Sequence, residues 1–274
     1  MPVLGEYIKS FLADHSGGTV SVWYGGLSGQ PSYARAEHIP HYAASTMKLP
    51  LLVAAYRCSE RGELDLDAAL PVHNLFRSAA DGTPFRLDRT DDQDDETWEL
   101  VGGHATLREL ALRSIVKSGN LATNLVLEQV GTEEVAEVLK SAGCTPDTVV
   151  QRGIEDAAAR EAGLDNLVTA ADLALVMRGI ADRSLASERT CIEVERVVSR
   201  QEHRGKIPAG LPTGTYVANK TGWVDGVAHD VALVRPESAE PYVLVVCTSV
   251  DAPEAEMSAL IAGISRRIWE ARVP

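Results

Sequence analysis

The 274-residue sequence has few aromatic residues and a shortage of basic ones. Phe, Trp and Tyr make up 5% of the chain, and 26 Lys and Arg stand against 39 Asp and Glu, which gives a formal net charge of -13. This charge argues against nucleic acid or an anionic membrane surface as a partner. The sequence also lacks an apolar run long enough to span a membrane, so we expect no membrane-spanning segment.

Cysteine and histidine are sparse and lack the spacing of metal sites. The four cysteines form no Cys-x-x-Cys pair and are expected to be buried, reduced thiols. The seven histidines form no His-x-x-x-His motif, so we expect neither a metal nor another cofactor. The first nine residues have no basic start followed by an apolar core, which predicts a cytoplasmic location; the mature form of an exported protein is the alternative.

The most informative segment is Ser45-Thr46-Met47-Lys48, which stands at the head of the apolar run 49–56. Residues three apart on a helix share one face, so the Lys48 amine can assist deprotonation of the Ser45 hydroxyl. Backbone N–H groups at a helix start also favour negative charge on an attacked carbonyl. Taken alone, however, such a segment more often marks a capping serine followed by a solvated lysine.

Two later motifs change that interpretation. Ser118–Asn120 reads Ser-Gly-Asn and Lys220–Gly222 reads Lys-Thr-Gly, in an order and at distances that suit one domain. Ser-x-x-Lys, Ser-Asp-Asn and Lys-Thr-Gly together are typical of class A β-lactamases and penicillin-binding proteins. The flanking segments Tyr42–Pro50 and Leu107–Leu110 match as well. The chain therefore resembles class A β-lactamases over most of its length.

This resemblance implies a role for each motif residue in a reaction through an acyl-enzyme. Ser45 would be the nucleophile, and Lys48 its activating base or a member of the proton relay. Ser118 would carry a proton to the leaving group, and Asn120 would position Lys48 and the substrate amide. The substrate would be a small molecule with a carbonyl and a carboxylate.

The third motif is expected on a strand edge along the substrate cleft. Lys220 would hold the serine of the second motif and attract an anionic substrate, while Thr221 would hydrogen-bond its carboxylate. Gly222 would let the substrate approach the strand closely. The backbone N–H groups of Trp223 and Ser45 would form the oxyanion hole.

Two positions depart from the family pattern. Gly119 stands where the family usually has Asp, which removes an expected hydrogen-bond acceptor between two retained cleft residues. His229 stands nine residues beyond Lys220, where many class A enzymes have an Arg that supports carboxylate binding. A His is mostly neutral at pH 7 and holds an anion less firmly. A structural strand residue is an equal alternative for His229.

The largest departure concerns the base for deacylation. Class A enzymes use a Glu followed by Leu-Asn, and no Glu-x-x-Leu-Asn occurs here. In the equivalent, shorter segment 151–161, Glu155 is the best candidate for activating water, ahead of Asp156. A helix with solvated acids is the alternative for this segment. Without a working base the acyl-enzyme would persist.

The hydrophobic pattern predicts an α/β fold in a single β-lactamase-like catalytic unit, 1–274. Residues 1–44 and 211–274 should form an α/β part, in which terminal helices flank an antiparallel sheet. Residues 45–210 should form a mainly helical part, with the site in the cleft between the two. The resemblance implies five strands in the sheet. The acidic run 88–96 is expected to be a solvated loop.

Short local patterns predict where some elements begin and end. Thr106 with Glu109 forms a capping-box pattern, and Thr169 with Asp172 is similar, so each pair predicts the start of a helix. The strand predicted over 19–24 is followed by Gly25-Gly26, which predicts a turn.

Three functions stay open on this evidence. The first is a serine hydrolase that resembles class A β-lactamases. The second is another serine acyl hydrolase or acyltransferase, such as a D-alanyl peptidase, an esterase or an enzyme of specialised metabolism. The third is a catalytically silent penicillin-binding or sensor domain, against which the intact motif residues argue.

Overall fold

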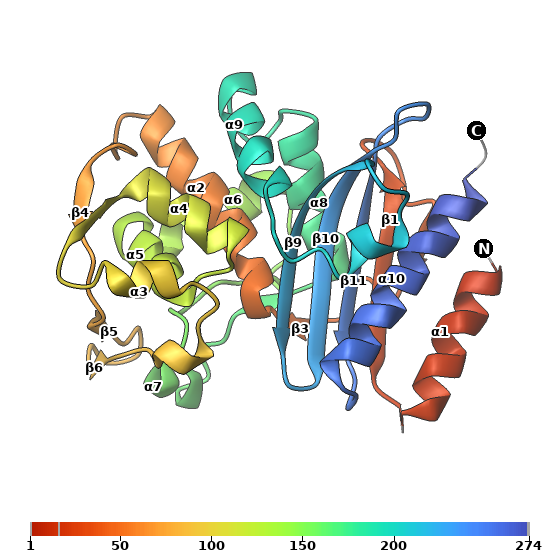
Figure 1. Cartoon of the computed structure of the whole chain (residues 1–274), viewed down its shortest axis with the longest axis horizontal. Helices are drawn as coiled ribbons and strands as arrows, with labels where there is room; N and C mark the ends of the chain where they lie inside the picture. The colour runs from red at the N-terminus through yellow and green to blue at the C-terminus, as the bar shows by residue number, and fades with distance from the viewer. Residues whose placement is uncertain (1, 16, 273–274) are drawn as a thin grey trace.

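The computed structural model of the protein describes residues 2–15 and 17–272. Its centre is a five-stranded sheet in the order β2-β1-β11-β10-β9, in which all neighbouring strands are antiparallel (Figure 1). The strands are β1 (Thr19–Gly26), β2 (Tyr33–Arg35), β9 (Tyr216–Val224), β10 (Val227–Arg235) and β11 (Tyr242–Ser249). The predicted fold class, with a sheet built from both ends of the chain, is confirmed.

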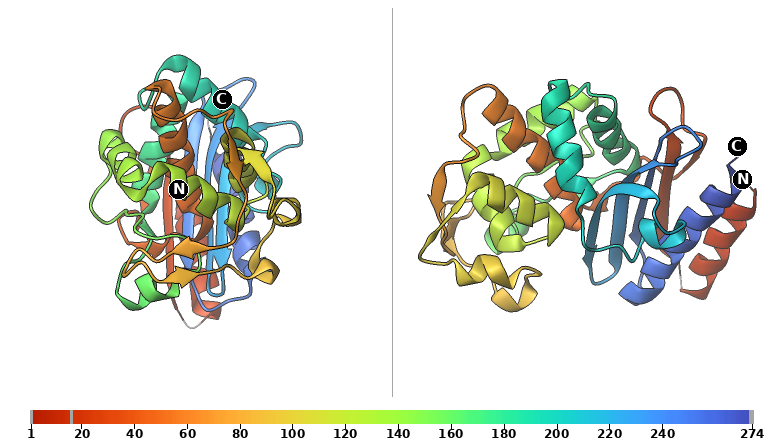
Figure 2. Two further views of the ribbon diagram at one scale, coloured as in Figure 1. Left: turned by 90° about the vertical axis from the view of Figure 1, so that its left-hand side faces the viewer. Right: turned by 45° about the horizontal axis from the view of Figure 1, so that its top comes forward.

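Helices cover both faces of this sheet. On one face lie α1 (Pro2–Asp14) and α10 (Glu254–Ala271), which are side by side and bring the two ends of the chain together (Figure 1). On the other face, α8 (Ala170–Ala181) packs against β1, β10 and β11. Figure 2 shows the same arrangement from two further sides.

Alternate residues of β11 enter the two cores. Val243 and Val245 belong to the core that includes α8, whereas Leu244 and Val246 belong to the core beneath the terminal helices. Successive side chains of a strand point to opposite faces, so a strand covered on both sides must be apolar throughout. The continuous apolar run in the sequence therefore marks the middle strand of the sheet.

The middle of the chain is mainly helical, and three pairs of short strands interrupt it. Its helices besides α8 are α2 (Lys48–Glu60), α3 (Asp95–Glu99), α4 (Leu107–Val116), α5 (Asn120–Val130), α6 (Thr132–Ala142), α7 (Ala157–Glu161) and α9 (Glu188–Ser199). The pairs are β3 (His41–Tyr42) with β8 (Leu167–Val168), β4 (Ala69–Pro71) with β7 (His104–Thr106), and β5 (Phe76–Arg77) with β6 (Pro84–Phe85). Because α8 comes from this segment yet packs on the sheet, the division into two parts stays a prediction.

Two helices begin where the sequence predicts. The Thr106 side chain accepts a hydrogen bond from the Glu109 backbone N–H, and the Glu109 carboxylate accepts one from Thr106 N, so a capping box starts α4. Thr169 Oγ1 accepts from Asp172 N at 3.0 Å and starts α8 in a similar way.

Two local predictions are wrong. The turn expected at Gly25 and Gly26 is absent from the described chain, because β1 continues through Gly26, which pairs with Tyr242. The acidic run 88–96 is more than a solvated loop. It forms the 3₁₀ turn η2 (Arg89–Asp91) and the start of α3, and it buries one of its carboxylates, that of Asp94. Across the described residues, none of the helices combines the length and apolar character needed to cross a membrane.

Gly210 brings the 3₁₀ turn η3 (Ile207–Gly210) directly against α10. A Cβ on Gly210 would stand 2.2 Å from the Ala262 carbonyl oxygen and 2.7 Å from Ser265 Cβ. We predict that Gly210→Ala lowers the free energy of unfolding by about 1–3 kcal/mol, as overpacking does, in urea unfolding followed by circular dichroism. The control is Gly205→Ala, where no described atom beyond the two adjoining residues lies within 4 Å of the added carbon. Equal losses in both variants would contradict the packing argument.

Candidate active site

The predicted nucleophile lines a cleft of about 720 Å³. Ser45 lies in the 3₁₀ turn η1 (Ala44–Met47), which runs directly into α2. Ser118, Asn120 and Glu155 line the same cleft. Further lining residues are Tyr42, Asp91, Gln93, Arg152, Asp156, Asn166, Trp223, Val224 and Asp225. The fold thus brings residues that are far apart in the sequence to one cavity.

Lys48 is fully buried beside the second motif. Its Nζ donates to the Ser118 carbonyl oxygen at 2.6 Å and to Asn120 Oδ1 at 2.9 Å. Burial lowers the pKa of Lys48 to about 7, with the Asp92 carboxylate acting in the opposite direction, so much of the amine is neutral at pH 7. Among the described residues no hydrogen bond joins Lys48 Nζ to Ser45, so the second motif holds the amine.

Ser118 lies between the two motif lysines. Lys48 binds its carbonyl oxygen, and Lys220 Nζ donates to its Oγ at 2.9 Å. Lys220 also donates to the Thr221 carbonyl oxygen at 2.7 Å and is fully buried. Burial, together with the charge of Lys48, holds the pKa of Lys220 well below its usual range. The Ser118 hydroxyl therefore has a proton donor at hydrogen-bond distance, as a proton carrier requires.

Backbone strain is concentrated at this cleft. Three of its lining residues adopt positive φ although they are not glycine: Ala44 at 44°, Ser118 at 63° and Glu155 at 61°. Each such conformation costs about 1–3 kcal/mol and persists only where the surroundings enforce it. The strained backbone thus lowers stability at three positions: the turn that holds the predicted nucleophile, the predicted proton carrier and the predicted base.

Gly222 lets β9 approach the nucleophile turn. A Cβ at this position would stand 2.9 Å from Ser45 N and 3.0 Å from Thr46 N. The sequence suggested a close approach of substrate, whereas the close contact in the structure is with η1 itself. Trp223 follows Gly222 and lines the cleft. The two backbone N–H groups predicted for the oxyanion hole therefore lie on adjoining segments.

Thr221 is fully buried on β9, and its Oγ1 has no hydrogen-bond partner among the described residues. Neither Thr221 nor Lys220 is part of the described lining of the cleft. Substrate contact by these two side chains accordingly stays a prediction.

His229 does not fit the role of a carboxylate-binding residue. Its ring is fully buried; Nε2 donates to the Tyr42 carbonyl oxygen at 2.8 Å, and Nδ1 accepts from Thr248 N at 3.1 Å. Burial lowers the pKa of His229 to about 4, so the ring is neutral at pH 7. A buried, uncharged ring with both nitrogens engaged holds no anion in the cleft. The structure favours the alternative, a structural strand residue.

Asp156 is occupied by structural contacts. Its side chain accepts from Ala159 N at 3.1 Å, which caps α7, and its Oδ2 accepts from Ala79 N at 2.7 Å. Only 1% of the residue is exposed. Both carboxylate oxygens are thus engaged by backbone donors, which leaves Asp156 poorly placed to activate water.

Glu155 has one carboxylate oxygen that is not hydrogen-bonded to another described residue. Its Oε2 accepts from Asp88 N at 2.8 Å, while Oε1 is buried and has no hydrogen-bond partner within the described residues. Burial raises the pKa of Glu155, and the nearby carboxylates of Asp88, Asp91 and Asp92 act in the same direction, whereas the hydrogen bond from Asp88 N acts against them. A more basic carboxylate with one unpaired oxygen, on a residue that lines the cleft, suits a general base for water.

Sequence reasoning missed the residues that hold the segment around Glu155. Arg152 is 3% exposed and pairs with Asp165 at 2.8 Å. Asn166 Oδ1 accepts from the backbone N–H groups of Gln151 and Arg152 at 2.8 and 3.2 Å. A single sequence gives no sign that these polar residues are buried and paired across the segment.

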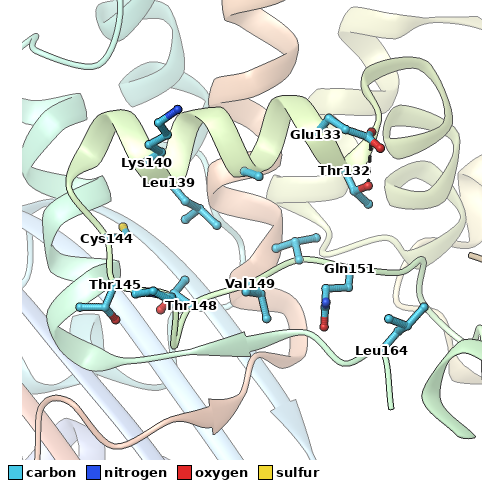
Figure 3. A pocket seen from close by; sticks show the side chains of 13 residues that line it. Thr132, Glu133, Leu139, Lys140, Cys144, Thr145, Thr148, Val149, Gln151 and Leu164 are labelled. Atoms are coloured by element: carbon cyan, nitrogen blue, oxygen red, sulfur yellow. Dashed lines mark hydrogen bonds between the residues drawn. The ribbon is translucent and has the colours of Figure 1, made fainter. Parts of the chain in front are cut away.

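A second hollow, of about 600 Å³, lies between α6 and the chain that follows it (Figure 3). Leu139 and Val149 line it from the two sides, and within the described chain it shares no lining residue with the cleft. Its one thiol belongs to Cys144, and burial raises the pKa of that thiol to about 12. The thiol stays protonated at neutral pH, so this hollow lacks an activated nucleophile.

The chain is similar to known proteins of one enzyme family. The model of the β-lactamase enzyme family matches residues 3–271, so the chain belongs to this family. The β-lactamase of Bacillus licheniformis is 30% identical over 170 residues, which are 61% of this chain and 55% of that relative. The chain thus spans little more than half the length of this curated relative.

Solved structures show the same fold. A β-lactamase from Sphaerobacter thermophilus matches with a TM-score of 0.81 and 24% identity, over 98% of this chain and 95% of that one. A mutant of PBP-A, solved as an acyl-enzyme complex with penicillin G, matches with a TM-score of 0.80 and 22% identity, over 99% of this chain and 96% of that one. At these identities the likeness concerns the fold alone.

Protonation of His229 should destabilise the fold in acid. Because the pKa of this ring falls from 6.5 to about 4 on folding, the unfolded chain binds its proton first as the pH falls. We expect this ring to lower the free energy of unfolding by about 2 kcal/mol between pH 7 and pH 5. Urea unfolding at both pH values measures the difference. His229→Gln should lose this part of the pH dependence, and the exposed His104→Gln should keep it; an unchanged dependence in His229→Gln would refute the assignment.

Proposed function

We propose that the protein is a serine hydrolase of the β-lactamase type, which hydrolyses a β-lactam or a related amide or ester through an acyl-enzyme on Ser45. The observation that carries this proposal is the position of Ser118, bound by Lys48 and Lys220, in the cleft that Ser45 lines. Family membership and the β-lactamase names of its relatives support it.

Acylation begins when the neutral Lys48 amine takes the proton of the Ser45 hydroxyl, directly or through the Ser118 hydroxyl. Ser45 Oγ bonds to the substrate carbonyl carbon, and the backbone N–H groups of Ser45 and Trp223 stabilise the oxyanion. The C–N or C–O bond then breaks. Ser118 gives its proton to the departing atom and regains one from the Lys48 ammonium.

Deacylation uses Glu155. Its carboxylate takes a proton from water, the water oxygen attacks the ester carbon, and the bond between that carbon and Ser45 Oγ breaks. The proton held by Glu155 is returned to Ser45 Oγ, which restores both groups, and the product acid leaves. The substrate is a small molecule, and its carboxylate group, like the cytoplasmic location of the protein, remains part of the proposal.

A second candidate is a protein that is acylated but deacylates slowly, as a penicillin-binding protein or an acyltransferase would. The observation in its favour is the segment around Glu155, which lacks Glu-x-x-Leu-Asn and has one Glu155 oxygen already bound to Asp88 N. The two candidates share acylation and differ in deacylation.

We predict that Glu155→Gln slows deacylation by about 100-fold or more, because the amide cannot take a proton from water. A chromogenic cephalosporin followed by absorbance and intact mass measures both half-reactions. Glu155→Gln should accumulate a covalent adduct, whereas Ser45→Ala should form none. Glu161→Gln, with an exposed side chain in the same segment, is the control and should behave as the wild type. A stable adduct in the wild type itself would favour the second candidate.

The rate constant of acylation should rise with pH, and the midpoint of this rise (the acid limb) should lie near pH 7. The reason is that only the neutral form of Lys48, whose pKa burial lowers to about 7, can take the Ser45 proton. Stopped-flow acylation by a fluorescent penicillin between pH 5 and pH 9 measures this limb. Lys48→Arg, which stays charged, should be acylated at least 100-fold more slowly. A rate that does not change across this pH range would exclude Lys48 as the base.

A further inference from the structure

The space beside Gly119 is filled by a carboxylate from another segment. A Cβ on Gly119 would stand 2.9 Å from Asp94 Cβ and 3.1 Å from Asp94 Oδ2. Asp94 is 2% exposed, accepts from Thr97 Oγ1 at 2.5 Å and lies 3.3 Å from Arg113 Nε. An Asp at position 119 would therefore overlap Asp94 and bring two like charges together. Glycine is the residue that fits.

The neighbouring Asp92 caps helix α5 from outside the helix. Its Oδ1 accepts from Asn120 N at 2.8 Å, and its Oδ2 accepts from Leu121 N at 2.8 Å. Trp98 Nε1 donates to the same Oδ2 at 2.9 Å. The first N–H groups of a helix have no partner within it, and a carboxylate is the acceptor that the helix dipole favours. Gly119, at the N-cap, has no side chain to serve them.

This cap fixes the residue that holds the predicted base. Asn120 Oδ1 accepts from Lys48 Nζ at 2.9 Å, and Asn120 Nδ2 donates to the Asp91 carbonyl oxygen at 3.0 Å. The backbone and the side chain of Asn120 are thus both anchored to Asp91 and Asp92. A shift of the acidic segment would move the amide oxygen that accepts the hydrogen bond from the Lys48 amine.

We infer that Asp92 is a positioning residue: it supplies the carboxylate that the second motif lacks at Gly119 and holds Asn120 where its amide oxygen meets the Lys48 amine. The inference rests on the proposed function, because Lys48 is the base of that reaction. The acidic run 88–96 would thus take part in acylation, a role that its composition alone does not indicate.

The charge of Asp92 also acts on Lys48. It raises the pKa of Lys48 against the larger, lowering effect of burial. Among the described residues, Lys220 on β9 is a further titratable group that interacts with the amine, and its own pKa is lowered by burial and by Lys48. Asp91 and Glu155 line the cleft as further acidic groups. Removing the Asp92 charge should accordingly favour neutral Lys48 and move the acid limb of acylation to lower pH.

Two variants, Asp92→Asn and Asp92→Glu, separate the effect of the position of the carboxylate from the effect of its charge. Asp92→Asn should lower the acylation rate constant at pH 8 by 10- to 100-fold, on the order of what a misplaced catalytic group costs, and should shift the acid limb to lower pH. Asp92→Glu keeps the charge but displaces the oxygens, so it should lose rate without that shift. The control is Asp95→Asn, whose side chain is 80% exposed and pairs with Arg89 at the surface. This control should match the wild type in the acylation rate constant and in the pH of the acid limb.

A second measurement keeps this test independent of the proposed function. The ¹³Cε resonance of Lys48, assigned with Lys48→Arg, reports protonation of the amine whether or not an adduct forms. A lower titration midpoint in Asp92→Asn supports the inference even if no substrate acylates the wild type. An unchanged midpoint, or wild-type acylation by Asp92→Asn, overturns it. Absence of any adduct in the wild type would overturn the proposed function alone.

Discussion

The cleft depends on the burial of two lysine side chains. Lys48 and Lys220 are fully inaccessible, and neither forms an ion pair within the described residues. Burying an unpaired charge is costly, so both amines are pushed toward the neutral state. Their hydrogen-bond partners are carbonyl, amide and hydroxyl oxygens, which satisfy the amine without fixing its charge. An acid in direct contact would hold Lys48 protonated and remove it as a base.

The surroundings of the cleft follow from this constraint. Ser118 presents its carbonyl oxygen to Lys48 and its hydroxyl to Lys220 while it adopts positive φ, and the fold carries that strain. Gly222 lets β9 contact η1, so the strand that holds Lys220 packs directly against the turn that holds Ser45. Farther from the cleft, η3 packs against α10 and also contacts β10.

What could be predicted from the sequence is what depends on near neighbours in the chain. The apolar runs marked the strands, and Thr106 and Glu109 marked a helix start. The first two motifs marked Ser45, Ser118 and Asn120, which line one cleft. Contacts between distant segments could not be predicted. The ring of His229 is held by a carbonyl 187 residues away, and the acceptor for Asn120 N lies 28 residues before it. No local pattern encodes such partners.

The acidic run 88–96 connects the two halves of the proposed reaction. Through Asp92 it holds Asn120, which receives the Lys48 amine, and through Asp88 N it holds one oxygen of Glu155. The Asp92 carboxylate acts against the burial effect on the pKa of Lys48, and the carboxylates of Asp88, Asp91 and Asp92 add to the burial effect on the pKa of Glu155. Both groups become stronger bases as a result. A segment that lies outside all three motifs therefore holds the proposed base of acylation and the proposed base of deacylation together, and the proposed chemistry is in this way compatible with a glycine at position 119.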